Sequence, residues 1–148
     1  MVLIKVKRLS AGAILPEFKT SGAAGADIAY DGSQGDTVAL YKFGTRLIPT
    51  GFSLDIPEGY EVQVRPRSGF SIKNVVLMPN SPGTIDSDYR GEVKVGLLYA
   101  GSDSCILVQT GERIAQLVVQ KVEPVEYQEV QELSDTERGS GGFGSTGR

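Results

Sequence analysis

The sequence contains no histidine among its 148 residues. Histidine is the commonest general base and the commonest metal ligand in enzymes, so its absence leaves carboxylates as the groups that would move protons. There is also only one cysteine, Cys105, which excludes an intrachain disulfide. Its apolar neighbours Ile106, Leu107 and Val108 indicate a small buried side chain in an intracellular protein.

Long apolar runs are missing as well, because no run approaches the roughly 18 residues that a membrane span requires. Met1 leads directly into a segment with strand-like alternation, without a signal peptide in front of it. A basic excess is also missing: the formal net charge is −3, so no overall positive field recruits nucleic acid. We therefore expect a soluble cytoplasmic protein that binds neither membrane nor nucleic acid and holds any anionic ligand locally.

What the sequence does contain is a repeated alternation of apolar and polar residues with a period of two, which predicts β-strands. The alternation is clearest in residues 2–7, 52–56, 60–65 and 93–97, and residues 113–122 predict a strand buried on both faces. The 19 glycines and 7 prolines imply many turns, one of them at Pro57–Gly59. The sequence thus predicts an all-β sandwich or jelly-roll fold, with one short helix at Ser68–Asn74 capped by Ser68.

The composition of the chain changes after Pro124. The following residues, 125–138, are rich in glutamate and weakly apolar, and the glycine-rich stretch RGSGGFGSTGR runs from Arg138 to Arg148. The length of the chain suits one domain. We therefore predict a jelly-roll domain over residues 1–125, followed over residues 126–148 by a tether and a mobile arm.

The glycine-rich stretch nearly matches the phosphate-binding P-loop pattern, but Ser145 stands where that pattern needs a lysine, and only two residues follow Thr146. A P-loop is therefore excluded. The remaining alternatives are a disordered Gly/Ser spacer and a mobile arm that carries a ligand. The cations Arg138 and Arg148 and the aromatic Phe143 favour the arm, since a spacer needs none of them.

Four further segments contain residues that strand formation does not explain. The first, AGADIAY, surrounds Asp27 with small residues, which is also typical of an ordinary glycine-rich turn. The second, PRSGFSIK, can surround an anion with Arg67, the Ser68 hydroxyl and the Gly69 N–H, or can be a capped turn without a ligand. Neither segment decides between its two interpretations alone.

The third segment, NSPGTIDSDYRGEVKV, contains two aspartates, Asp86 and Asp88, that would share one face of a strand. Such a pair can bind a metal, can supply a base beside a spectator, or can be a solvated strand edge. In the fourth segment, GERIAQLVV, Gln116 interrupts an apolar strand close to Arg113. A glutamine there is either a satisfied core amide or a ligand contact.

Taken in order, AGADIAY, PRSGFSIK, GTIDSDYRGEV, GERIAQLVV and RGSGGFGSTG resemble the five motifs of the homotrimeric dUTP pyrophosphatases, the dUTPases, over residues 24–147. The resemblance implies a jelly-roll homotrimer whose active sites are each built from all three chains. It implies hydrolysis of dUTP to dUMP and pyrophosphate with Mg²⁺, which lowers dUTP and supplies dUMP for thymidylate synthesis. It also gives the arm a role, as a lid that closes a neighbouring subunit's site over the bound nucleotide.

The resemblance further implies roles for individual residues. Asp86 would activate the water that attacks the α-phosphorus. The residues implied to bind substrate divide by the part of the nucleotide that they contact: Arg67, Ser68, Gly69 and Gln116 for the phosphates; Asn80, Gly83, Thr84, Ile85 and Lys94 in the hairpin that selects uracil; Tyr89 beneath the sugar; Phe143 stacked on uracil; and Arg138, Gly144, Ser145 and Thr146 on the γ-phosphate. Mg²⁺ would be carried by the triphosphate without a direct protein ligand, with Asp27 as its outer-shell neighbour.

Two other functions stay open on the sequence alone. A dCTP deaminase shares this fold and trimer but needs a glutamate at the base, for which Glu92 is the only candidate near the hairpin. A non-catalytic trimeric binding or regulatory protein would also keep the nucleotide pocket, but the presence of both Asp86 and the arm disfavours it. Phe70, Ile72 and the segment LLYAGSDS depart from the family pattern outside the implied reaction centre, so they concern packing and subunit contacts.

Overall fold

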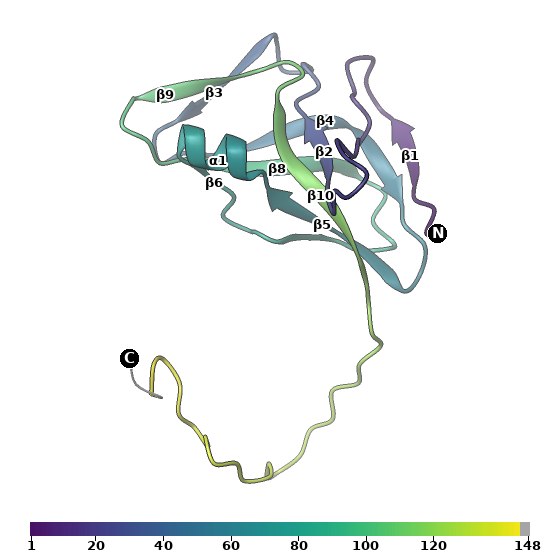
Figure 1. Cartoon of the computed structure of the whole chain (residues 1–148), viewed down its shortest axis with the longest axis vertical. Helices are drawn as coiled ribbons and strands as arrows, with labels where there is room; N and C mark the ends of the chain where they lie inside the picture. The colour runs from purple at the N-terminus through teal and green to yellow at the C-terminus, as the bar shows by residue number, and fades with distance from the viewer. Residues whose placement is uncertain (146–148) are drawn as a thin grey trace.

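The computed structural model describes residues 1–145, so the predicted site residue Thr146 lies outside the described residues. This part of the chain forms antiparallel strands and one short helix, which confirms the predicted all-β class (Figure 1). The first sheet has the order β1 (Lys5–Arg8), β4 (Thr45–Asp55), β8 (Glu92–Tyr99) and β6 (Val76–Leu77). The second has the order β2 (Ala26–Ala29), β10 (Arg113–Lys121), β5 (Tyr60–Pro66) and β7 (Gly83–Ile85). The strands β3 (Thr37–Tyr41) and β9 (Cys105–Gln109) form a separate two-stranded ribbon.

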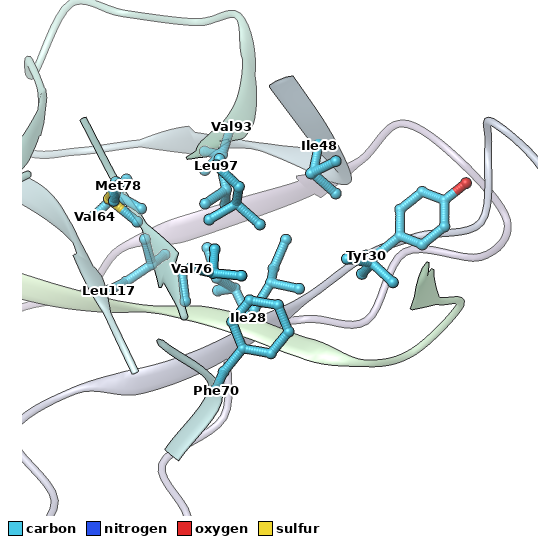
Figure 2. Close-up of a cluster of buried hydrophobic side chains, with 14 of the residues drawn as sticks. Ile28, Tyr30, Ile48, Val64, Phe70, Val76, Met78, Val93, Leu97 and Leu117 are labelled. Carbon is cyan, nitrogen blue, oxygen red and sulfur yellow. The ribbon is translucent and has the colours of Figure 1, made fainter. Parts of the chain in front are cut away.

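The hydrophobic core lies between the two four-stranded sheets. Figure 2 shows Ile28, Val64 and Leu117 from the second sheet together with side chains from the first, among them Ile48, Val93 and Leu97. Full burial of one such aliphatic side chain stabilises the fold by about 1.5–3 kcal/mol. The sandwich is therefore held mainly by the apolar residues of the alternating pattern, which occupy its inner faces.

The strands follow the predicted alternation closely, although their ends differ. In β5, buried Val62 and Val64 alternate with half-buried Gln63 and Arg65. The predicted strand at residues 2–7 is shorter and begins at Lys5. The predicted turn before β5 is confirmed, because the N–H of Tyr60 donates to the carbonyl of Pro57.

The only helix among the described residues is α1 (Ser68–Asn74). Its position was predicted correctly, but the prediction that Ser68 caps it was wrong. The N-cap is Arg67, which has extended backbone (φ −90°, ψ 125°) and makes no side-chain capping bond, and Ser68 is the first helical residue. Phe70 is the helix residue that enters the core, where its ring packs among the buried side chains of Figure 2.

A β-bulge in β4 packs against the N-terminal loop that contains Ser10. The register between β4 and β8 shifts between Pro49 and Ser53, and Gly51 has a φ of 72°. A Cβ at Gly51 would lie 2.3 Å from Ser10 Oγ and 2.7 Å from Asp31 Oδ2. Only glycine fits this close approach with that backbone.

Asp31, beside the bulge, is 4% exposed. Its carboxylate accepts hydrogen bonds from the Ser10 hydroxyl (2.7 Å), the Ser33 N–H (3.0 Å) and the Ser33 hydroxyl (2.8 Å). Burial raises the pKa of Asp31, but the bonds from Ser10 and Ser33 favour the charged form and leave the pKa below its ordinary value. The charged carboxylate therefore links the loop at Ser33 to Ser10, which is distant in the sequence.

After β10 the chain leaves the sheets. The N–H of Val122 still donates to the carbonyl of Gly59, and beyond it residues 123–145 run away from the body of the molecule (Figure 1). In this part, apolar side chains such as Tyr127 and Leu133 are exposed. None of the helices in the described part of the chain has the length and apolar character needed to span a bilayer.

Candidate functional site

A hollow of about 270 Å³ lies where β5 and β7 meet β8, and we call it the hairpin hollow. The segment NSPGTIDSDYRGEVKV, to which the resemblance assigns base selection, contributes much of its lining. Its lining includes the predicted catalytic residue Asp86 and the predicted substrate-binding residues Asn80, Gly83, Thr84, Ile85, Tyr89 and Lys94. The structure thus brings together the hairpin residues that the sequence singled out.

Two glycines shape the hairpin hollow around the Asn80 side chain. A Cβ at Gly83 would lie 3.1 Å from Asn80 Nδ2, and a Cβ at Gly96 would lie 3.4 Å from Asn80 Oδ1. The amide therefore lies close to the backbone of both β7 and β8. A side chain at Gly83 would push the Asn80 amide group out of its position in the lining of the hollow.

Asp86 and Asp88 do not lie on a strand, which corrects the expectation that they share one strand face. The strand β7 ends at Ile85, and the N–H of Tyr89 donates to the carbonyl of Asp86 in a turn. Arg90 braces this turn, because its Nη1 donates to the carbonyls of Ser87 and Tyr89. Of the two aspartates, Asp86 lines the hairpin hollow.

The Tyr89 side chain lies over the backbone at Gly91, just after the turn. Its hydroxyl donates to the carbonyl of Glu92 (3.1 Å), and a Cβ at Gly91 would lie 2.3 Å from that hydroxyl. Tyr89 is 47% exposed, so part of the residue faces the solvent and can contact a ligand. Gly91 is thus required for this position of the tyrosine ring.

The hairpin hollow also has lining residues that the sequence did not assign to substrate: Leu47, Val64, Met78, Glu92, Val93 and Gly96. Three of them, Val64, Val93 and Gly96, lie on predicted strands, and only the pairing of those strands shows which of their residues reach the hollow. Glu92 is held in place by the bulge of β4, since Gly51 N–H donates to its Oε1 (3.0 Å) and Lys94 Nζ lies 3.4 Å from its Oε2. Both carboxylate oxygens of Glu92 are therefore engaged by protein groups.

A second group of predicted site residues lies around Asp27 in β2, and we call Asp27, Arg67 and Arg113 the arginine cluster. Arg67 Nε lies 2.8 Å from Asp27 Oδ1, and Arg113 Nη1 lies 2.9 Å from Asp27 Oδ2. Arg67 Nη1 also donates to the carbonyl of Arg113 (2.9 Å). The strand register creates this cluster, because β10 pairs with both β2 and β5.

Gln116, on β10, lies beside the arginine cluster. Its Nε2 donates to the carbonyl of Pro66 (2.9 Å), which fixes the end of β5 just before Arg67. A Cβ at Gly25 would lie 2.2 Å from Gln116 Oε1, so the small residues of AGADIAY make room for this amide. The predicted residues Ser68 and Gly69 follow Arg67 directly and are exposed. The predicted phosphate-binding residues of the body of the chain, Arg67, Ser68, Gly69 and Gln116, thus lie close together.

The hairpin hollow and the arginine cluster lie toward opposite ends of β5. Ile85, next to Asp86, pairs with Val62, near the start of β5, whereas Arg67 follows its end. At about 3.3 Å per residue, the chain from Val62 to Arg67 covers roughly 16 Å. The cluster does not line the hairpin hollow. One chain therefore does not place Asp86 beside Arg67.

Among the described residues, the predicted arm residues Arg138, Phe143, Gly144 and Ser145 are exposed. Arg138 Nε donates to the carbonyl of Gly141 (2.9 Å), and the Ser145 N–H donates to the carbonyl of Gly142 (3.0 Å). Phe143 has a φ of 50° and Gly144 a φ of 89°. Figure 1 shows this part of the described chain well separated from the sheets.

Within residues 1–145, no three His, Cys, Asp or Glu side chains are grouped so that they could hold a metal ion. Asp27 gives one carboxylate oxygen to each arginine of its cluster. Both oxygens of the Asp27 carboxylate are therefore engaged by arginines.

Comparison with known proteins identifies close relatives of the chain. Residues 11–147 match the family model described as dUTPase. A deoxyuridine 5'-triphosphate nucleotidohydrolase of Chlamydia muridarum is 52% identical over 141 residues, which cover 95% of this chain and 95% of the relative. An enzyme of the same name from Beijerinckia indica is 53% identical over 146 residues, which cover 97% of this chain and 91% of the relative.

Solved structures of phage dUTPases have the same fold. A mutant of the phage 80alpha enzyme superposes with a TM-score of 0.86 at 30% identity and covers 97% of this chain and 98% of its own. Another mutant of the Staphylococcus bacteriophage 80alpha enzyme, solved with dUpNHpp, has a TM-score of 0.81 at 29% identity and covers 99% of both chains. A mutant from phage phi11 of S. aureus, described as coordinating a structural Mg(II) ion, has a TM-score of 0.76 at 26% identity and covers 88% of this chain and 97% of its own.

Proposed function

The chain belongs to the dUTPase family and hydrolyses dUTP to dUMP and pyrophosphate, and we propose that Asp86 activates the water that attacks the α-phosphorus. The observation that carries this proposal is the position of the Asp86 carboxylate in the lining of the hairpin hollow. Because the chain has no histidine, a carboxylate is the natural general base. Within residues 1–145, no cation forms an ion pair with Asp86, so its oxygens are available to a water molecule.

We propose that uracil and deoxyribose bind in the hairpin hollow. The close approach of the Asn80 amide to Gly83 and Gly96 supports a base site in which backbone and amide groups read the edge of the ring. A hydrogen-bond donor that faces position 4 would pair with the carbonyl of uracil but not with the amino group of cytosine, so cytosine would leave polar groups unpaired. A close wall at C5 excludes the methyl group of thymine, and Tyr89 beneath the sugar excludes a ribose 2'-hydroxyl. Thr84, Ile85 and Lys94 complete the walls of this site.

We propose that Arg67, Ser68, Gly69 and Gln116 bind the phosphates. The guanidinium, the hydroxyl and the backbone N–H groups supply donors that neutralise and orient the triphosphate without a covalent bond. Mg²⁺ is proposed to be carried on the triphosphate; the phage phi11 relative is described as coordinating a structural Mg(II) ion. Asp27 remains a predicted outer-shell neighbour of that ion.

We further propose that each site is shared between subunits of a homotrimer. The roughly 16 Å of β5 between Val62 and Arg67 separates Asp86 from the phosphate-binding residues of its own chain. A second copy that presents its arginine cluster to the hairpin hollow would complete the site. Residues 126–148 would then be the tether and arm that bring Arg138, Phe143, Gly144, Ser145 and Thr146 to the nucleotide of a neighbouring subunit, while residues 1–125 form the jelly-roll domain. A cytoplasmic location remains a prediction from the sequence.

The test is the release of pyrophosphate from dUTP, dCTP, dTTP and UTP, each with Mg²⁺, by the wild-type protein and by the Asp86→Asn variant. We expect release from dUTP alone, and a fall in kcat of about 10²–10⁴-fold in the variant. Asp103→Asn makes the same chemical change at an exposed loop position and should leave kcat unchanged. An Asp86→Asn protein that retains full kcat would remove Asp86 from the mechanism.

The same assay distinguishes the deaminase alternative through the ammonia that dCTP would release. Deamination would need the Glu92 carboxylate to move protons on cytosine. Both oxygens of Glu92 are engaged, one by the Gly51 N–H and one by Lys94, which disfavours that role. Release of ammonia from dCTP would contradict this interpretation.

A further inference from the structure

The Asp27 carboxylate of the arginine cluster is nearly buried, and the backbone of Asp27 is paired on both sides. The backbone N–H and C=O of Asp27 are both paired with Glu17, through bonds of 2.8 Å and 3.2 Å. On its other side, Asp27 is aligned with Gln116 in the register between β2 and β10. Its side chain is only 13% exposed. The carboxylate therefore has little freedom to change its direction.

Each oxygen of this carboxylate contacts a different arginine. Oδ1 lies 2.8 Å from Arg67 Nε, and Oδ2 lies 2.9 Å from Arg113 Nη1. The side chains of Arg67 and Arg113 are 23% and 46% exposed, so a ligand can reach both. Without Asp27 between them, two guanidinium groups at this spacing would repel each other.

The hydrogen bonds of Arg67 leave one side of its guanidinium open. Nε is bound to Asp27 and Nη1 to the carbonyl of Arg113, while Nη2 makes no hydrogen bond within residues 1–145. Arg113 uses only Nη1 in this part of the chain. Guanidinium groups held in this way present fixed donors, which suits bidentate binding of phosphate oxygens.

From this geometry we propose that Asp27 is a positioning residue that holds Arg67 and Arg113 together as a phosphate clamp, which makes Arg113 an additional phosphate-binding residue. The proposal rests on the proposed function, because it requires Arg67 to bind the phosphates of dUTP. It differs from an outer-shell role toward Mg²⁺: a clamp acts on the phosphates directly, so its effect persists when no Mg²⁺ is present.

The test measures the dissociation constant of the non-hydrolysable analogue dUpNHpp by isothermal titration calorimetry, once with Mg²⁺ and once with EDTA. We expect Asp27→Asn to weaken binding by about tenfold or more under both conditions, because the charged bonds that orient two arginines are lost. The affinity for dUMP, which has fewer phosphates to contact the clamp, should fall by less than about threefold. Asp103→Asn is the matched control, and its dissociation constants should equal those of the wild type.

Arg113→Gln provides a second route if Asp27→Asn does not fold. We expect it to weaken dUpNHpp by about tenfold, and Arg113→Lys to weaken it less, since lysine keeps the charge but loses the fork of donors. Wild-type affinity in Arg113→Gln would overturn the clamp.

Three outcomes for Asp27→Asn would overturn the proposal: unchanged affinity, a loss confined to the titration with Mg²⁺, or an equal loss for dUpNHpp and dUMP together with a lower Tm. The first removes any role of Asp27 in binding, the second assigns it to the metal, and the third makes it merely structural. Failure of the wild-type protein itself to bind dUpNHpp would instead count against the proposed function.

Discussion

Replacing Asp31 with asparagine removes a buried charge and leaves the shape of the side chain nearly unchanged. The asparagine oxygen can keep the two bonds from Ser33, and the new amide NH₂ group faces the Ser10 hydroxyl. Hydrogen bonds to a charged group are roughly twice as strong as neutral ones, at about 2 against about 1 kcal/mol net. If each of the three bonds weakens by about 1 kcal/mol, the total loss is up to about 3 kcal/mol. Because a neutral side chain costs less to bury than a charged one, the free energy of unfolding should fall by about 1–2 kcal/mol.

The loss of stability depends on pH in a direction that the structure fixes. The pKa of Asp31 is lowered in the folded protein, because the bonds from Ser10 and Ser33 outweigh the effect of burial. A lowered pKa contributes stability that is complete above the unfolded value of about 3.9 and disappears as the pH falls through the folded value. The difference between wild type and Asp31→Asn should therefore be full at pH 7 and should shrink toward pH 3.

The assay is urea unfolding followed by far-UV circular dichroism at pH 7 and pH 3, at one protein concentration because the stability of an oligomer depends on it. Asp103→Asn is again the matched control, since its side chain is exposed and makes no hydrogen bond in the described residues. An Asp31→Asn protein as stable as the wild type at pH 7 would refute the reasoning. A stability difference that stays the same at pH 3 would refute its electrostatic part.

Two further predictions concern the proposed site. In Gly83→Ala, the added Cβ would lie 3.1 Å from Asn80 Nδ2 and 3.5 Å from Val64 Cβ, so we expect the KM for dUTP to rise about tenfold by displacement of the amide. Steady-state pyrophosphate release measures the KM, and an unchanged KM would mean that uracil binds elsewhere. Truncation after Glu137 should lower kcat by about tenfold or more through loss of the lid but should leave Tm unchanged, because the hydrogen bonds of residues 138–145 are internal to the arm in the described structure. A truncated protein with full kcat would contradict the role of the arm.

The sequence predicted the parts of the fold that depend on local pattern. The alternation around Val62 and Val64 identified β5, and the apolar run from Arg113 identified β10. The bulge at Gly51 escaped prediction because it depends on Ser10 and Asp31, which lie far away in the sequence. Local patterns likewise cannot distinguish an N-cap from the first helical residue, so the cap was wrongly assigned to Ser68.

The candidate site was predictable in its residues but not in its arrangement. The motifs identified Asp27, Arg67 and Asp86, and the strand pairing then placed the first two together and the third elsewhere. The two-arginine contact of Asp27 depends on the register of β10 against both of its neighbours. Residue spacing within a motif contains no information about that register.

The claim that the site is shared between subunits is tested most directly by combining two defective variants. Asp86→Asn impairs the hairpin hollow and Arg67→Gln impairs the arginine cluster, so each variant alone should be nearly inactive. The two are co-expressed with different affinity tags, and mixed oligomers are purified through both tags. If the two halves come from different chains, about one site in three of each doubly tagged trimer will contain two intact halves, and activity will return. Mixed oligomers no more active than the separate variants would contradict the shared site.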